Sequence, residues 1–167
     1  DCGRAGTGYV NLYNGDVVIA RPLTQCGGNR MPVSITAYYG AQLSGVTARV
    51  GSHWRLSCDQ CMNKSYINDE LYFIWSKGDG DQQYFKKPNS SAAYYEDLSG
   101  LSLKLTDNGT YTEIEDKGGT VMRFESPQDA LDDTGRLLSI TDSCGNTNTF
   151  QYGDWRLERI TDGAGRV

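Results

Sequence analysis

A ten-residue segment near the C-terminus occurs twice, twenty residues apart. Residues 136–145 read RLLSITDSCG, residues 156–165 read RLERITDGAG, and six of the ten positions are identical. The shared frame Ile-x-Asp-x-x-Gly occurs a third time at 114–119, and a partial copy, Asp-x-x-Gly-Arg-Leu, lies at 132–137. A repeat of this length with a turn at every copy predicts two short strands per unit.

The frame predicts a strand that runs into a tight turn. An Asp at the first turn position accepts a hydrogen bond from the amide two residues later, and a Gly at the fourth position tolerates positive φ. The expected turn pairs are Asp116 with Gly119, Asp132 with Gly135, Asp142 with Gly145, and Asp162 with Gly165. Asn14 and Gly15 form a further expected turn, because Asn-Gly is the strongest short hairpin signal.

The composition favours strands over helices. The chain holds 11 Tyr, 4 Phe and 3 Trp, residues that suit a pleated and half-buried surface, and it has no long run with helical periodicity. The sequence therefore predicts an all-β fold of repeated antiparallel hairpins that form a curved or spiralling sheet. The net charge of −5 argues against a nucleic-acid partner, and the absence of a long apolar run argues against membrane insertion.

We expect one continuous structural unit with four parts. They are a loop or disordered opening at 1–8, an opening β domain at 9–69, a hairpin meander at 70–130, and repeats at 131–167. The last repeat is expected to stop at its turn, which leaves a strand edge that further repeats of a full-length chain would pair.

The order of the motifs resembles the opening of Rhs-type regions, which carry YD repeats, in bacterial proteins. Val10-Asn11 with Asn14-Gly15 matches the first hairpin of such regions, and residues 32–39 match their Pro-Leu-Ser-Leu-Thr-x-x-Tyr strand. Residues 51–54 match their Gly-x-Gly-Trp turn, with His53 in place of the second glycine. The segments 132–137 and 162–167 resemble the Asp-x-x-Gly-Arg-Leu core of YD repeats, with Leu131 and Thr161 where Tyr is usual.

The resemblance implies a structural role. Rhs-type sheets, like the similar spiral of teneurins on animal cell surfaces, wind into a hollow shell that encloses a C-terminal cargo, often a toxin. The resemblance implies a secreted or cell-surface, non-enzymatic wall segment, whose partners are neighbouring repeats of the full-length chain and the enclosed effector. The alternative is a cell-surface adhesion or carbohydrate-binding β module that binds glycans through exposed aromatic side chains.

Cys58 and Cys61 form the sharpest candidate for a metal site. A structural zinc site needs four ligands, and the chain has one His and no second pair of close cysteines. We therefore expect no metal and no cofactor, and we favour a disulfide or a reduced structural pair. The five cysteines leave the redox compartment open.

No residue is assigned to catalysis. His53 lies beside Ser52 and Ser57, but the chain has no Gly-x-Ser-x-Gly elbow, and packing next to a tryptophan explains the histidine. A small hydrolase centred on His53 is the third hypothesis. Asp79 and Asp81 lack the remaining ligands of a calcium loop and are expected at the tip of a hairpin turn.

Overall fold

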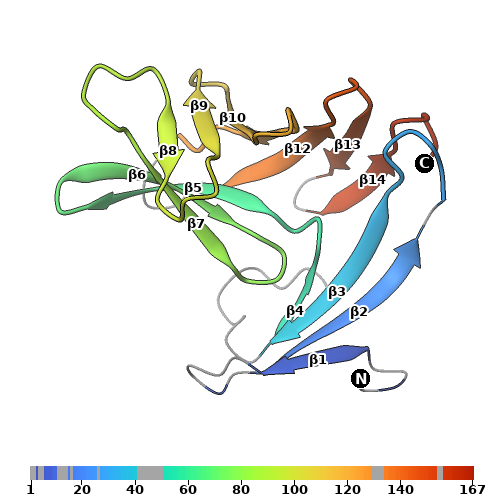
Figure 1. Cartoon of the computed structure of the whole chain (residues 1–167). Helices are drawn as coiled ribbons and strands as arrows, with labels where there is room; N and C mark the ends of the chain where they lie inside the picture. Colours follow the sequence, from blue (N-terminus) through green and yellow to red (C-terminus); the bar gives the residue numbers. More distant parts are fainter. Residues whose placement is uncertain are drawn as a thin grey trace.

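The computed structural model describes residues 3, 6–10, 15, 17–25, 27–40, 51–128, 134–153 and 156–167. Over these residues the chain forms two antiparallel sheets and no helix, hence none that could span a membrane (Figure 1). The all-β expectation is confirmed. The strands are β1 (Thr7–Val10), β2 (Val17–Gln25), β3 (Ser34–Gly40), β4 (Trp54–Leu56), β5 (Cys61–Ile67), β6 (Glu70–Ser76), β7 (Gln82–Lys86), β8 (Tyr95–Asp97), β9 (Lys104–Asp107), β10 (Tyr111–Glu115), β11 (Val121–Glu125), β12 (Gly135–Thr141), β13 (Thr147–Tyr152) and β14 (Leu157–Thr161).

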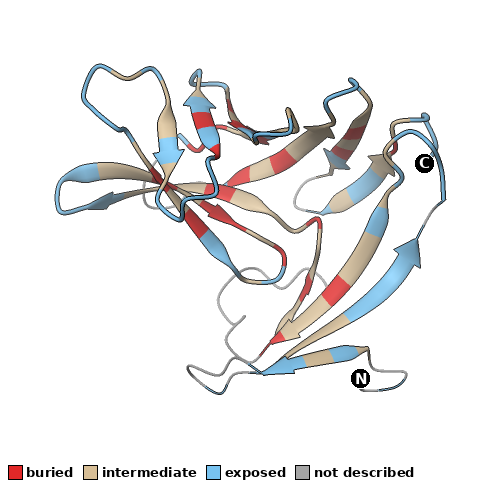
Figure 2. Cartoon of the chain, viewed as in Figure 1, coloured by how far each residue is buried: buried red, intermediate tan, exposed pale blue. Residues whose placement is uncertain are grey.

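The smaller sheet is the meander β1-β2-β3-β4. Its first two strands, β1 and β2, are largely exposed (Figure 2). Among the described residues, the ladder between β1 and β2 runs from the pair Thr7–Ala20 to the pair Val10–Val17. Gly15 has φ of +73°, the conformation that favours glycine. Asn14 lies outside the described residues.

The larger sheet is a meander in which every strand from β5 to β14 pairs with the next one. β12 also returns to the first strand, because Gly135 and Arg136 pair with Met62 and Cys61 of β5. Further along the same edge, residues 139–141 pair with β13. Strands β5 to β12 thus close into an eight-stranded barrel. The sheet is curved, as expected, but its closure was not foreseen, and β13 and β14 continue past the closing point.

Gly135 permits this closure. It begins β12 as a buried strand residue, and a Cβ there would overlap the backbone oxygen of Glu125, well inside the 3.0 Å that real Cβ atoms respect. Only glycine therefore lets β12 pass so close to the end of β11. The expected turn at 132–135 has its glycine in a strand, and Asp132 lies outside the described residues.

A bulge in β12 also contributes to closure. Arg123 pairs with Ser139 and Phe124 pairs with Leu137, so Leu138 is an extra residue with no partner in β11. Bulges bend and twist the strand that carries them. We infer that this bend directs the first residues of β12 toward β5.

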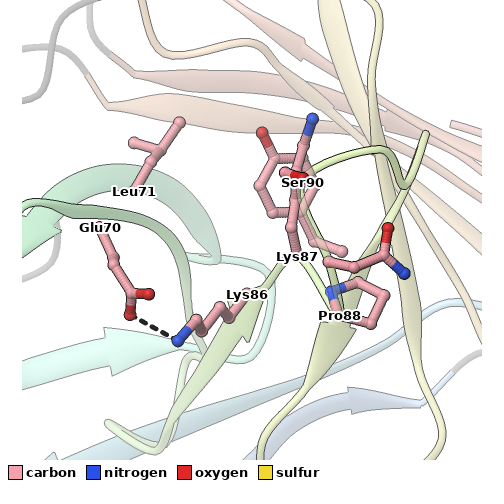
Figure 3. Close-up of a pocket in the computed structure, with 8 residues that line it drawn as sticks. Glu70, Leu71, Lys86, Lys87, Pro88 and Ser90 are labelled. Carbon is pink, nitrogen blue, oxygen red and sulfur yellow. Dashed lines mark ion pairs between the residues drawn. The ribbon is translucent and has the colours of Figure 1, made fainter.

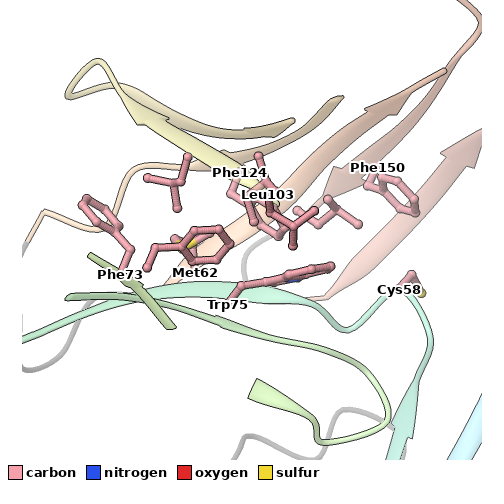
Figure 4. Close-up of a cluster of buried hydrophobic side chains, with 11 residues drawn as sticks. Cys58, Met62, Phe73, Trp75, Leu103, Phe124 and Phe150 are labelled. Atoms are coloured by element: carbon pink, nitrogen blue, oxygen red, sulfur yellow. The ribbon is translucent and has the colours of Figure 1, made fainter. Parts of the chain in front are cut away.

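The barrel interior is a packed hydrophobic core. Side chains with no exposed surface come from seven of its strands: Met62, Phe73, Phe85, Leu105, Ile114, Phe124 and Leu137. They face one another between the strands, together with Trp75 and Leu103 (Figure 4). Each large apolar side chain contributes roughly 1.5–3 kcal/mol when fully buried, so this cluster is the main stabilising element of the fold.

The two sheets meet at a corner formed by residues 57–60. The Leu56 amide donates to Asp59 Oδ2 at 2.8 Å, and Trp75 Nε1 donates to Gln60 Oε1 at 3.0 Å. β5 belongs to the larger sheet, so the meander expected from residue 70 begins one strand earlier. Ile35 of the smaller sheet packs against the barrel core, which ties the two sheets together.

Candidate functional site

Three Asp-x-x-Gly turns share one set of hydrogen bonds. In each, the Asp Oδ1 accepts from the amides two and four residues later, at 2.8–2.9 Å. The glycine amide donates to the Asp carbonyl at 2.8–3.1 Å, and the glycine φ lies between +80° and +82°. These turns are Asp116–Gly119, Asp142–Gly145 and Asp162–Gly165. The structure thus places six of the predicted turn residues in the geometry that the frame implies.

The hydrogen bonds hold the pKa of each turn aspartate below its usual value. The strongest cause differs among them: the Thr120 amide for Asp116, the Asn146 side chain for Asp142, and the Arg166 side chain for Asp162. Partial desolvation acts in the opposite direction. The three carboxylates are therefore ionised at neutral pH, and each acts as a hydrogen-bond acceptor for the backbone amides of its own turn.

The three turns form a row on one rim of the larger sheet, here named the turn row. Neighbouring strands are antiparallel, so β10, β12 and β14 all end at the same rim. A Cβ on Gly119 would lie 3.3 Å from the Ser143 Cβ of the next turn. The Gly163 amide donates to Asn148 Oδ1 at 3.0 Å, which links the third turn to β13.

β12 and β14 carry a bulge at the same position of the repeat. In β14, Gln151 pairs with Arg159 and Tyr152 pairs with Leu157, so Glu158 is the extra residue. Glu158 is the third residue of its ten-residue copy, as Leu138 is of the earlier copy. β14 and the turn after it therefore repeat β12 and the turn after it in bulge, turn geometry and sequence.

The outer edge of β14 differs from that of β12 in one respect. The corresponding edge of β12 is paired with β13, whereas β14 has β13 as its only partner among the described strands. The outer edge of β14 thus resembles the edge of β12 that is paired with β13.

The barrel end opposite the turn row is polar; its inward-facing side chains Lys64, Tyr95, Asp107 and Ser126 are here named the barrel mouth. Lys64 Nζ lies 3.4 Å from Asp107 Oδ2, and Ser126 Oγ donates to Asp107 Oδ1 at 2.8 Å. Burial, followed by the charge of Asp107, raises the pKa of Tyr95. Its hydroxyl therefore keeps its proton at neutral pH and is a hydrogen-bond donor.

An open pocket lies beside the barrel mouth and shares Tyr95 with it. Its volume is about 490 Å³, and its lining residues are Glu70, Leu71, Lys86, Lys87, Pro88, Asn89, Ser90 and Tyr95. These come from the start of β6, the end of β7, the loop after β7, and β8 (Figure 3). No sequence signal predicted this pocket, because its walls come from separate segments that only the folded barrel brings together.

Cys58 and Cys61 lie at the corner between the sheets. Cys58 is buried in the hydrophobic core, and Cys61 is the first residue of β5. Across the described part of the chain, no group of three or more His, Cys, Asp or Glu side chains is placed to hold a metal ion. Cys2 and Cys26 are not among the described residues.

His53 has φ of +65°, a left-handed backbone conformation that favours glycine. Its ring lies edge-on to Tyr39, with centroids 6.2 Å apart, and its buried Nδ1 has no hydrogen-bond partner among the residues described. Within the same residues, no hydrogen bond joins His53 to Ser52 or Ser57. The histidine is thus placed in a packed turn next to Trp54.

Two acidic residues singled out from the sequence lie at a hairpin tip. The Asp81 amide donates to Asp79 Oδ1 at 3.1 Å, and the Asp81 carboxylate pairs with Lys77 at 2.7 Å. The β5–β6 turn was missed: Asn68 and Asp69 have φ of +51° and +62°, as a two-residue type I′ turn requires. The Asn-Asp pair between two runs of strand formers was the available signal.

No protein-family model matches this chain, and no curated protein sequence matches it at a significant level.

Proposed function

We propose that this chain is a non-enzymatic wall segment of an Rhs-type protein with YD repeats. Its strands would help to build a secreted or cell-surface β-shell around a C-terminal toxin or effector. The observation that carries the proposal is the repetition of β12 and the turn after it by β14 and the turn after it. Because the two strands share a bulge and are followed by the same turn, the outer edge of β14 has the form of the β12 edge that receives β13.

The turn after β14 supports the same proposal. The Asp162 amide donates to the Arg166 carbonyl at 2.9 Å, as the Asp142 amide does to the Asn146 carbonyl at 3.0 Å. Residue 167 therefore corresponds to Thr147, the first residue of β13. We expect a further strand that begins at residue 167 and pairs with β14 as β13 pairs with β12.

The relation between the barrel and the continuing sheet is also consistent with a growing wall. Strands β5 to β12 form a closed unit with a packed core, and the sheet leaves this unit through β13 and β14. Added repeats would extend that sheet strand by strand. Repeat units bury their apolar faces mainly against their neighbours, so each unit would stabilise the one before it.

The experiment adds one strand to the chain. A copy of residues 148–152 (NTFQY) is placed after Val167, which reproduces the order of turn and strand that follows β12. We expect slower amide exchange at Ile160, whose amide lies on the same edge of β14 as that of Asp162, together with a higher urea midpoint. The matched control has proline in place of the copied phenylalanine, because proline cannot donate to a strand ladder.

Unchanged exchange in β14 after the extension would remove the basis of the proposal. The coding sequence beyond residue 167 gives a second test. Further Asp-x-x-Gly-Arg repeats are expected there, and their absence would contradict the shell.

A further inference from the structure

We propose that the open pocket beside the barrel mouth binds a carboxylated sugar residue of the hexuronate class. Its volume of about 490 Å³ lies within the range of roughly 300–1,000 Å³ that is usual for small-molecule sites. The inference does not depend on the wall proposal, because the pocket lies at the end of the barrel opposite the turn row and uses no residue of β14.

The charges of the pocket favour an anion. Glu70 and Lys86 form an ion pair at 2.5 Å (Figure 3); a hydrogen bond within this pair lowers the pKa of the glutamate and raises that of the lysine. Lys87 has no carboxylate within salt-bridge distance among the described side chains. Its Nζ lies 5.4 Å from the centre of the Tyr95 ring. One uncompensated positive charge therefore lines the pocket, which suits a ligand with a single carboxylate.

The walls of the pocket suit a hydroxylated ring. Leu71, Pro88 and Tyr95 provide apolar surface against which the C–H faces of a sugar ring can pack. Asn89 Oδ1 accepts from the amide and hydroxyl of Ser91, at 3.1 and 2.8 Å, so its Nδ2 is oriented as the donor that remains. Ser90 adds a hydroxyl. Hydrogen-bond donors for the ring hydroxyls and for the carboxylate thus lie next to an apolar surface.

The test is a titration of the chain with sodium glucuronate, followed by amide chemical shifts. We expect saturable shifts at residues 87–90. Glucose, which lacks the carboxylate, should bind about tenfold more weakly, as should glucuronate to Lys87→Gln, because each comparison removes one charge-assisted hydrogen bond. The matched control is Lys104→Gln, since Lys104 Nζ lies 5.3 Å from the Tyr94 ring but does not line the pocket. This control should bind like the parent chain.

Three outcomes would overturn the inference. The first is the absence of saturable shifts at millimolar glucuronate. The second is equal weakening by Lys87→Gln and Lys104→Gln, which would show that the pocket charge is not used. The third is equally tight binding of cyclohexanecarboxylate, which would show that the ring hydroxyls are not recognised. None of these outcomes affects the strand-extension test of the wall proposal.

Discussion

Replacing Gly135 with alanine should open the barrel at its point of closure. The added Cβ would overlap the backbone oxygen of Glu125 and lie 3.3 Å from Cδ of Pro127. Glu125 cannot yield easily, because its carboxylate accepts two hydrogen bonds from the Arg136 guanidinium, each at 2.7 Å. The overlap can therefore be relieved only by a shift of β12 away from β11 or from β5.

The expected cost lies at the upper end of the range for overpacking. Forcing extra atoms into a packed site costs typically about 1–3 kcal/mol, and here the clashing atom is backbone rather than a flexible side chain. We therefore expect a loss of about 3 kcal/mol in the free energy of unfolding. β12 makes only two pairs with β5, at Met62 and Cys61, so these pairs should separate first.

Gly145→Ala is the matched control. Nothing lies within 4 Å of a Cβ at this position, but φ is +82°, so the cost is conformational and should be about 1 kcal/mol. Urea unfolding followed by circular dichroism gives both free energies, and amide exchange at Met62 and Arg136 locates the damage. If Gly135→Ala costs no more than Gly145→Ala, closure does not depend on the missing side chain and the reasoning is refuted.

Two further predictions concern the turns. The turn aspartates have depressed pKa values in the folded chain, whereas unfolded aspartate titrates near a pKa of about 3.9, so the unfolded state takes up protons first as the pH falls. Stability should hold above about pH 5 and decline below about pH 4, and a urea midpoint that stays constant in acid would contradict this assignment. His53→Gly should leave stability unchanged or raise it by up to about 1 kcal/mol, because glycine adopts positive φ without strain and removes a buried, unpaired nitrogen. His53→Ala should lower stability. A higher urea midpoint for His53→Ala than for His53→Gly would contradict this explanation.

Local signals in the sequence predicted the all-β fold class and the three turns at 116–119, 142–145 and 162–165. The Asp-x-x-Gly frame works because its hydrogen bonds form within five residues, so Asp142 and Gly145 need no distant partner to define the turn. The Asn14-Gly15 turn stays a prediction, because Asn14 lies outside the described residues.

Barrel closure and the pocket could not be predicted, because both depend on contacts between distant segments. Gly135 appeared in the sequence as the end of a turn, yet its function is to let β12 pass the Glu125 backbone oxygen. The Asp-x-x-Gly pattern indicates that a glycine tolerates positive φ, but it does not indicate which other segment of the chain will lie against that glycine. In the same way, Leu71 and Tyr95 are ordinary strand residues in the sequence, and only the order β8-β7-β6 places them around one pocket.

The outer edge of β14 combines two features that favour pairing with a specific strand over non-specific strand pairing. Glu158 and Arg159 stand where β12 has Leu138 and Ser139, and both are exposed. Charged side chains on an edge strand discourage pairing with arbitrary chains. Yet the bulge and the Asp162 turn, which fix the register of the next strand, are retained. An edge that only terminated the sheet would need the charged side chains, but it would not need the bulge and the turn that repeat those of β12. Under the wall proposal, this combination fits a strand from the same polypeptide, delivered by the turn at Asp162 in the correct register.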